Sequence, residues 1–149
     1  MNYIHAQGNN RPVYTLAIVT SLSRIPSHSI RQYIDKGLII PYKLDSKRHL
    51  FSEVDLIRLN YINKLLNDGG LNIAGIKTLM AHIPCWAIRK CSVKGRKACQ
   101  AYYSTSNPCW TASKKSRECR NVDCRECKVY RSIEQYPDLK ALYKDLLMN

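Results

Sequence analysis

Residues 15–43 decide the fold of this chain of 149 residues, and their sequence is TLAIVTSLSRIPSHSIRQYIDKGLIIPYK. Thr15 is a suitable N-cap for a short helix, and Pro26-Ser27 then breaks the chain and caps a second helix, from Ser27 to about Lys36. Gly37 ends the second helix, because glycine adopts the left-handed conformation that often follows a helix. Two short helices about four residues apart predict a helix-turn-helix.

A hairpin is predicted next along the chain. Two short extended runs, residues 38–43 and 48–51, flank a polar turn at Asp45-Ser46-Lys47. This turn has no glycine, the residue that the commonest hairpin turns favour. We expect the hairpin to form the wing of a winged helix.

Two further helices complete the first half. One begins after Ser52, with Asp55 in a capping-box position, and continues until Gly69-Gly70 stops it. Another helix with a regular apolar stripe follows it. We therefore predict one small winged-helix domain over residues 14–84. A flexible arm over residues 1–13, which has no apolar periodicity, precedes it.

The second half has a different composition. All seven cysteines lie between Cys85 and Cys127. Residues 85–131 show little apolar periodicity, which predicts a small irregular module that needs a metal or cross-links to fold. Residues 132–149 return to helical spacing and predict one amphipathic helix. The expected fold class is mainly α: a winged helix, an irregular cysteine-rich module and a C-terminal helix.

The chain is strongly basic, with a formal net charge of +13. Residues 1–84 hold ten Lys and Arg against five Asp and Glu, and residues 85–131 hold twelve against three. An excess of this size indicates a polyanionic partner, and nucleic acid is the usual one. In the cysteine-rich module, the alternative explanation of the excess is a solvated basic surface or compensation of thiolate charge around a metal.

Several motifs of the first half occur in the order and spacing of a known family. They are Tyr14-Thr15, residues 29–33 (SIRQY), residues 36–39 (KGLI), residues 49–52 (HLFS), Asp55-Leu56 and residues 71–77 (LNIAGIK). Over residues 14–83 the chain resembles MerR-type winged helix-turn-helix transcriptional regulators. The SIRQY and LNIAGIK runs most resemble the branch that contains heat-shock and nitrogen-metabolism repressors.

The resemblance implies contacts with double-stranded DNA from the second helix and from the wing. The candidate residues are Ser27, His28, Arg31, Tyr33, Lys43, Lys47, Arg48 and His49. Arg31 is the strongest, because an arginine fork pairs with a guanine edge or clamps a phosphate. Alternatives remain for some: Tyr33 packs beneath the wing, or Lys43 and Lys47 are simply solvated. Arg48 and His49 also differ from the aromatic and the arginine that are usual there.

The resemblance also implies a homodimer that works with RNA polymerase at the promoter. A palindromic operator requires two copies of the reading helix. Many relatives dimerise through a long helix after the fourth one, but here Pro84-Cys85-Trp86 follows at once. The C-terminal helix either replaces that element or packs on the cysteine-rich module.

The cysteine-rich module contains an approximate duplication. Pro84-Cys85-Trp86, Cys91 and Cys99 with Tyr102 are echoed by a second series, which is Pro108-Cys109-Trp110, Cys119 and Cys127 with Tyr130. This pattern resembles a small bacterial module called two-CW.

The candidate metal ligands are four of the seven cysteines, which are Cys85, Cys91, Cys99, Cys109, Cys119, Cys124 and Cys127. Thiolates that gather in a reducing compartment need a cation to cancel their charge. Only Cys124 and Cys127 have the two-residue separation that is typical of zinc sites. An iron-sulfur cluster is our first expectation, with Trp86 and Trp110 screening it from water. Zinc is the second, and a metal-free thiol or disulfide switch is the third.

The sequence predicts a cytoplasmic protein, since it contains neither a membrane-length apolar run nor a secretory signal. The resemblance to MerR-type regulators implies a bacterial protein associated with the nucleoid. No paired carboxylates, serine nucleophile motif or phosphate-binding glycine loop occurs, so we do not expect an enzyme. The leading hypothesis is a transcriptional regulator whose DNA binding or DNA distortion responds to the cysteine-rich module. The alternative is a protein-interaction or assembly factor whose cysteines hold a structural zinc.

Overall fold

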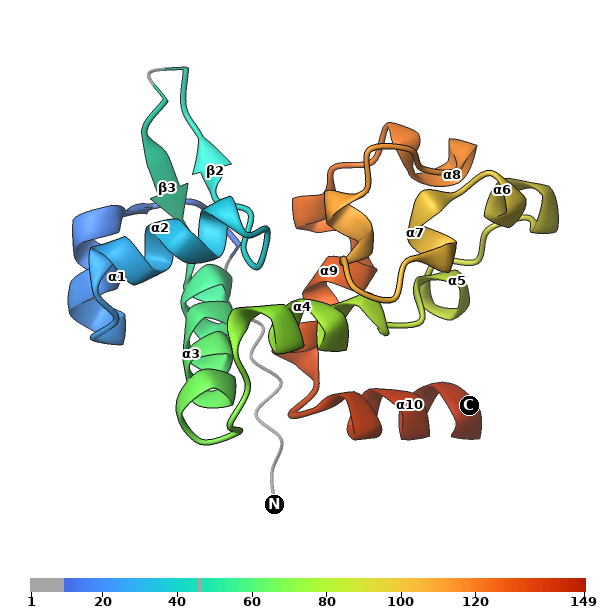
Figure 1. Cartoon of the computed structure of the whole chain (residues 1–149). Coiled ribbons are helices and arrows are strands. Elements are labelled where there is room, and N and C mark those ends of the chain that lie inside the picture. The colour runs from blue at the N-terminus through green and yellow to red at the C-terminus, as the bar shows by residue number, and fades with distance from the viewer. Residues whose placement is uncertain (1–9, 46) are drawn as a thin grey trace. The chain divides into compact units, whose positions relative to one another are not determined.

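The computed structural model describes residues 10–45 and 47–149 of the chain (Figure 1). The mainly helical class predicted from the sequence is confirmed. The predicted flexible arm falls largely on residues 1–9, which lie outside the described residues, as does Ser46 of the predicted wing turn. The chain divides between Ile73 and Ala74 into two compact units. No helix among the described residues is both long enough and apolar enough to span a membrane.

The first unit contains the predicted winged helix-turn-helix. Its elements are β1 (Tyr14–Thr15), α1 (Leu16–Ser23), α2 (Ser27–Asp35), β2 (Tyr42–Lys43), β3 (His49–Phe51) and α3 (Glu53–Asn67). The three strands form one antiparallel sheet in the order β1-β3-β2, in which Tyr42 pairs with Leu50. The sheet and α1–α3 enclose an apolar core of Val19, Ile25, Ile30, Leu38, Ile39, Phe51, Leu59 and Ile62.

The ends of the first two helices follow from local chemistry. The Thr15 hydroxyl accepts the backbone N–H of Ile18 (3.4 Å), so the predicted cap of α1 is confirmed. Arg24, in the left-handed region at φ 59°, ends α1. Helix α2 begins without a side-chain cap, because Pro26 occupies the N-cap position. The predicted start of the helix at Ser27 is confirmed, whereas the predicted cap from Pro26-Ser27 supplies no side-chain hydrogen bond.

The wing closes without glycine. The backbone N–H of Leu44 donates to the Arg48 carbonyl (3.1 Å), and the N–H of Lys47 donates to the Leu44 carbonyl (2.9 Å). Lys47 adopts φ 65°, the conformation that glycine usually supplies in such turns. The hairpin thus places a lysine at the strained position of its tip.

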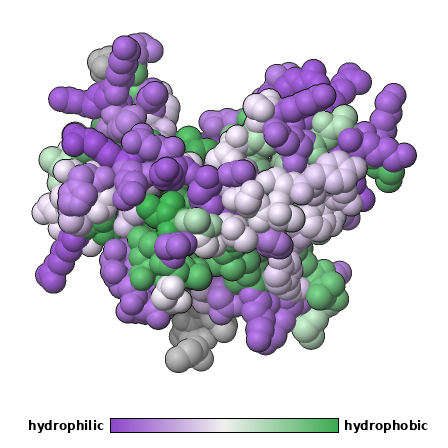
Figure 2. All heavy atoms as spheres, in the orientation of Figure 1, coloured by the Kyte–Doolittle hydropathy of each residue, from purple (hydrophilic) through white to green (hydrophobic). Residues whose placement is uncertain are grey.

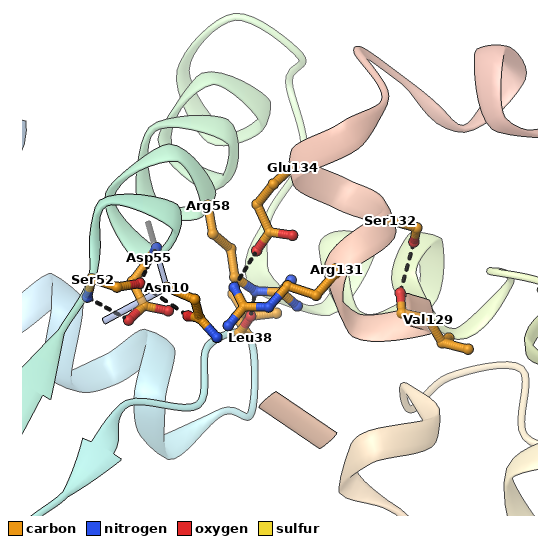
Figure 3. A network of polar contacts seen from close by, with 9 residues as sticks. All are labelled: Asn10, Leu38, Ser52, Asp55, Arg58, Val129, Arg131, Ser132 and Glu134. Carbon is orange, nitrogen blue, oxygen red and sulfur yellow. Dashed lines mark hydrogen bonds and ion pairs between the residues drawn. The ribbon is translucent and has the colours of Figure 1, made fainter. Parts of the chain in front are cut away.

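Helix α3 begins with a capping box, as the sequence predicted (Figure 3). The Ser52 hydroxyl accepts the N–H of Asp55 (3.2 Å), and the Asp55 carboxylate accepts the N–H of Ser52 (2.8 Å). Ser52 also donates to the Asn10 side chain (3.2 Å). Both members of the box are fully buried, so they satisfy backbone groups that water does not reach.

We expect the substitution Ser52→Ala to lower the free energy of unfolding by about 1 kcal/mol, because α3 loses its side-chain cap. Urea denaturation followed by circular dichroism measures this change. Asn60→Ala, on an exposed position of the same helix, is the matched control and should shift the transition little. Equal effects of the two substitutions would contradict a capping role for Ser52.

The second unit is built from short helices. It contains most of α4 (Ile73–Ala81) and then α5 (Cys85–Ile88), α6 (Val93–Lys97), α7 (Gln100–Tyr103), η1 (Cys109–Thr111), α8 (Arg117–Arg120), η2 (Cys124–Glu126), α9 (Lys128–Gln135) and α10 (Leu139–Met148). The irregular character predicted for residues 85–131 agrees with these short elements.

The C-terminal segment differs from its prediction. We expected one helix over residues 132–149, but the chain forms α9, which starts at Lys128, and a separate α10. Pro137 lies in the break, and Asp138 caps α10 by accepting the N–H of Ala141 (2.8 Å). Proline lacks the N–H that helix continuation requires, so the continuous apolar spacing did not produce a continuous helix.

The duplication predicted from the sequence is visible in the packing of the second unit. Each Pro-Cys-Trp triplet has proline at the N-cap of a short helix, α5 or η1. Helix α5 packs against α9 and η1 packs against α7, so the start of each repeat contacts the end of the other. Each repeat also forms an edge-to-face aromatic pair of its own, Trp86–Tyr102 (5.4 Å) and Trp110–Tyr130 (5.1 Å). The two repeats are interlocked.

Candidate nucleic-acid interface and cysteine cavity

The exposed face of α2 carries the first group of predicted DNA-binding residues. Ile30 and Tyr33 turn into the core, which leaves His28 and Arg31 exposed and Ser27 half-buried. The Arg31 guanidinium makes no hydrogen bond or ion pair with any residue in the described parts of the chain. A cation without an internal partner on the second helix of a helix-turn-helix is available to a base edge or a phosphate.

The wing carries the second group. Lys43, Lys47 and Arg48 are exposed and His49 is half-buried. Hydrophilic side chains predominate on this hairpin, at the upper left of Figure 2, although Leu44 is also exposed. The left-handed conformation of Lys47 fixes the backbone from which its ammonium extends, at the tip of the hairpin. The wing therefore presents three cations to solvent from a short, hydrogen-bonded turn.

Tyr33 does not belong to this surface. Its side chain is only 4% exposed, and burial raises the pKa of its phenol. This burial agrees better with the alternative weighed from the sequence, in which Tyr33 packs beneath the wing, than with a contact to the DNA backbone. The backbone contact from Tyr33 stays a prediction.

Two exposed residues of this region were missed in the sequence. Arg24 lies in the turn before α2, and Gln32 shares the exposed face of α2 with Arg31. A glutamine amide can pair with an adenine edge, and an arginine in a tight turn can contact a phosphate. The helical spacing of Ile30 and Tyr33 contained the signal for Gln32, since it assigns the opposite face to solvent.

The seven cysteines, which are free thiols, line a single cavity of about 50 Å³ in the second unit. This volume exceeds the roughly 10–15 Å³ that one water molecule needs, so the cavity has room for a small guest. Both repeats contribute thiols, so the interlocked packing is what gathers seven cysteines that lie up to 42 positions apart in the sequence.

Cationic side chains accompany the thiols. Lys115 lines the cavity and donates from Nζ to Sγ of Cys124 (3.2 Å). Arg89 also lines it, donates to the Glu118 carbonyl (3.1 Å) and hydrogen-bonds the sulfur of Cys119. Positive charge beside sulfur favours the thiolate form that ligates metals. Part of the basic excess of residues 85–131 therefore belongs to the cysteine cavity.

Similarity to known proteins identifies the first half of the chain. A family model described as the MerR HTH family regulatory protein matches residues 14–83. Residues 14–83 form a MerR-type helix-turn-helix domain. The match covers β1 to α4, and it agrees with the resemblance carried by the SIRQY and LNIAGIK motifs.

Individual relatives align with the MerR-type domain. A putative heat shock protein HspR from Streptomyces coelicolor is 32% identical over 69 residues, which are 46% of each chain. The HTH-type transcriptional regulators GlnR of Bacillus anthracis and Bacillus cereus are 38% identical over 69 residues, 46% of this chain and 53% of theirs. The chain thus spans about half the length of the curated relatives it matches, and the heat-shock and nitrogen branch predicted from the sequence is confirmed.

The cysteine cavity lies after the MerR-type domain, so its chemistry rests on its own residues. Seven thiols with adjacent cations suit a thiophilic metal or an iron-sulfur cluster as a set of donors. Their arrangement does not yet suit one: in residues 10–45 and 47–149, no three His, Cys, Asp or Glu side chains are grouped so that they could hold a metal ion. The thiols would have to close further around any bound centre.

A hydrogen bond between Cys85 and Cys109 shifts the pKa values of these two thiols in opposite directions. The Cys109 thiol hydrogen-bonds Cys85, and this bond lowers the pKa of Cys85 to about 7 against the opposing effect of its burial. The same bond, together with burial, raises the pKa of Cys109 far above its usual range. Burial also raises the pKa of Cys119. Of this pair, Cys85 is therefore the thiol that ionises more readily, because Cys109 donates to its sulfur.

We expect Cys85 to be alkylated faster than Cys119 at neutral pH in the reduced, metal-free protein, because alkylation requires the thiolate. The Cys85 rate should fall as the pH drops through about 7, where its thiolate takes up a proton. The Cys119 rate should rise only in more alkaline solution, since its pKa is raised. Timed labelling with iodoacetamide, quenching and peptide mass spectrometry give both profiles. Parallel profiles would contradict the assigned hydrogen bond.

Proposed function

We propose that this protein is a DNA-binding transcriptional regulator in which α2 and the wing read an operator. The observation that carries the proposal is the exposed Arg31, which has no hydrogen-bond or ion-pair partner within residues 10–45 and 47–149, on the second helix of a MerR-type domain. Relatives of this domain include proteins named as transcriptional regulators. The exposed cations of the wing would contact the backbone, where charge fixes the register without reading sequence.

The test of this proposal begins by selecting an operator from random duplexes with the wild-type chain. Arg31→Ala should then weaken operator binding by roughly 10- to 100-fold, which corresponds to the loss of one bidentate arginine contact. Lys64→Ala, an exposed cation at the end of α3, is the matched control and should leave affinity unchanged. Circular dichroism establishes that both variants are folded. Operator affinity that survives Arg31→Ala, or failure to select any operator, would overturn the proposal.

We further propose that the cysteine cavity controls this DNA binding. Seven thiols on one cavity, with Lys115 and Arg89 beside them, support a sensing centre over a mere structural role. An iron-sulfur cluster is the first choice, zinc the second, and reversible thiol oxidation the third. The bound centre would supply a redox-dependent or metal-dependent change of shape, while the residues of this chain hold it.

Anaerobic purification with metal analysis and a visible absorption spectrum separates these choices. Iron and sulfide in brown protein support a cluster, whereas colourless protein with zinc supports the alternative assembly factor with a structural metal. Operator affinity is then compared between the reduced, oxidised and metal-depleted chains. Equal affinity in all three states would overturn control by the cavity while leaving DNA binding itself intact.

The proposed regulator would act on DNA as a homodimer and would influence RNA polymerase at the promoter. Palindromic operators match two-fold protein dimers, so two reading helices would be needed. Leu147 and Met148 of α10 are 85% and 83% exposed, which makes this helix a reasonable site for the second copy.

A further inference from the structure

The second unit contains a basic pocket beside the cysteine cavity. A recess of about 360 Å³ is lined by Ala112, Ser113, Lys114, Lys115 and Arg120. Three of these five residues carry a positive charge, and none carries a negative one. Like charges that share a recess repel one another, and an anion placed between them relieves the repulsion.

The loop that carries the pocket is held in place by the backbone and the side chain of Gln100. The backbone N–H of Gln100 donates to the Lys114 carbonyl (2.9 Å), and the Ser113 hydroxyl donates to Oε1 of Gln100 (3.2 Å). The remaining lining residue of the pocket is Arg120, the last residue of α8. The cations therefore extend from anchored backbone, which limits the entropy lost when a ligand binds them.

Two of the three cations, Lys114 and Arg120, differ from Lys115 in their contacts. The Lys114 ammonium and the Arg120 guanidinium form no hydrogen bond or ion pair with any other residue that the structure describes, and both are exposed. Lys115 is different, because it lines both the pocket and the cysteine cavity and donates to Sγ of Cys124. One cation thus stands between the two sites.

We propose that this pocket binds a phosphate group, and that Lys115 makes the binding sensitive to the cysteine cavity. A phosphate offers several oxygen acceptors to two ammonium groups and a guanidinium, and charge-assisted bonds of this kind are the strong ones. The phosphate is either a free or small-molecule phosphate or a phosphodiester of DNA. The proposal does not depend on operator reading by α2, since the pocket lies in the other unit.

The coupling follows from the Lys115 contact. While Lys115 donates to Cys124, its charge is shared with the sulfur, and the pocket receives less of it. A change at Cys124 that removes the sulfur acceptor makes the Lys115 ammonium available to donate to the phosphate. Because coupling between sites is reciprocal, phosphate in the pocket would in turn weaken the Lys115–Cys124 contact.

The first experiment titrates the full-length, reduced chain with inorganic phosphate at constant ionic strength by calorimetry. Lys114→Gln and Arg120→Gln should each weaken binding about tenfold, the loss expected for one charged hydrogen bond. Lys97→Gln, an exposed cation of α6 outside the pocket, is the matched control and should leave affinity unchanged. No phosphate binding by the wild type, or equal weakening in the control, would overturn the pocket.

The second experiment tests the coupling with two cavity variants. Cys124→Ala should bind phosphate several-fold more tightly, because Lys115 loses its sulfur partner. Cys127→Ala removes another cavity thiol, one to which Lys115 does not donate a hydrogen bond. The affinity of this variant for phosphate should therefore match that of the wild type. An unchanged affinity in Cys124→Ala, or the same gain in Cys127→Ala, would overturn the role of Lys115.

The third experiment identifies the source of the phosphate with a short duplex of arbitrary sequence. If the pocket takes a DNA phosphodiester, Arg120→Gln weakens this binding and reduces the slope of log affinity against log salt by about one. If it takes a small phosphate, Arg120→Gln changes phosphate binding alone. Either pattern supports the pocket, and a variant that changes neither ligand's affinity overturns it.

Discussion

The substitution Arg58→Ala should lower the free energy of unfolding of the first unit by about 3 kcal/mol. Arg58 is fully buried in α3, and its Nε donates to the Leu38 carbonyl (2.8 Å), as Figure 3 shows. Alanine would leave this carbonyl without its donor and would open a cavity where the side chain lay. Leu38 lies in the segment that leads from α2 to the wing, so Arg58 ties this segment to α3.

Urea denaturation measures this effect, and two further variants define its cause. Lys64→Ala, an exposed position of the same helix, should change stability by less than about 0.5 kcal/mol. Arg58→Lys retains a cation without the guanidinium geometry and should fall between the wild type and Arg58→Ala. If Arg58→Ala were as stable as the wild type, the Leu38 contact would not hold this segment.

The local chemistry of the first unit could be predicted because each signal lies within a few residues. Thr15 caps the helix that follows it, and Ser52 with Asp55 forms a capping box three residues long. Gly37 adopts φ 75° after α2, as a helix-ending glycine should. Such caps depend on backbone groups one turn away, so no knowledge of the tertiary fold is needed.

The positions that escaped prediction depend on distant partners or on competing signals. Buried Arg58 could be suspected only from its spacing, since it lies four residues from Val54 and from Ile62 on the inner face of α3. The break before α10 was hidden because the apolar spacing continues through Pro137. The helix nevertheless ends there, because Pro137 lacks the N–H that an uninterrupted helix requires.

The candidate sites divide in the same way. Arg31 was found from its motif, and its exposure agrees with the assigned role, whereas Tyr33 shares the motif but turns into the core. The cysteine cavity required the tertiary fold, because its thiols come from separate short elements of two interlocked repeats. The duplication indicated that the two halves correspond, but not that every cysteine would line one cavity.

The interlocked repeats are not equivalent in burial, and this gives the largest stability difference that we expect. Trp110 is 8% exposed and meets the ring of Tyr130, which is 1% exposed, edge to face. In the other repeat, Trp86 and Tyr102 form the same pair but are only half-buried. The second repeat therefore provides more of the core.

Trp110→Ala should lower the free energy of unfolding of the second unit by about 4 kcal/mol, because it leaves a large cavity and removes an aromatic pair. Trp86→Ala, the equivalent change in the other repeat, should cost only about 1–2 kcal/mol, since part of that ring already faces water. Urea denaturation of the reduced chain compares them, with Trp110→Phe as the variant that restores most of the packing. If the two alanine variants were equally unstable, the repeats would contribute equally, and the cavity between them would not depend more on the second. A large loss at Trp110 would instead mean that the thiols are held chiefly by the core around Tyr130.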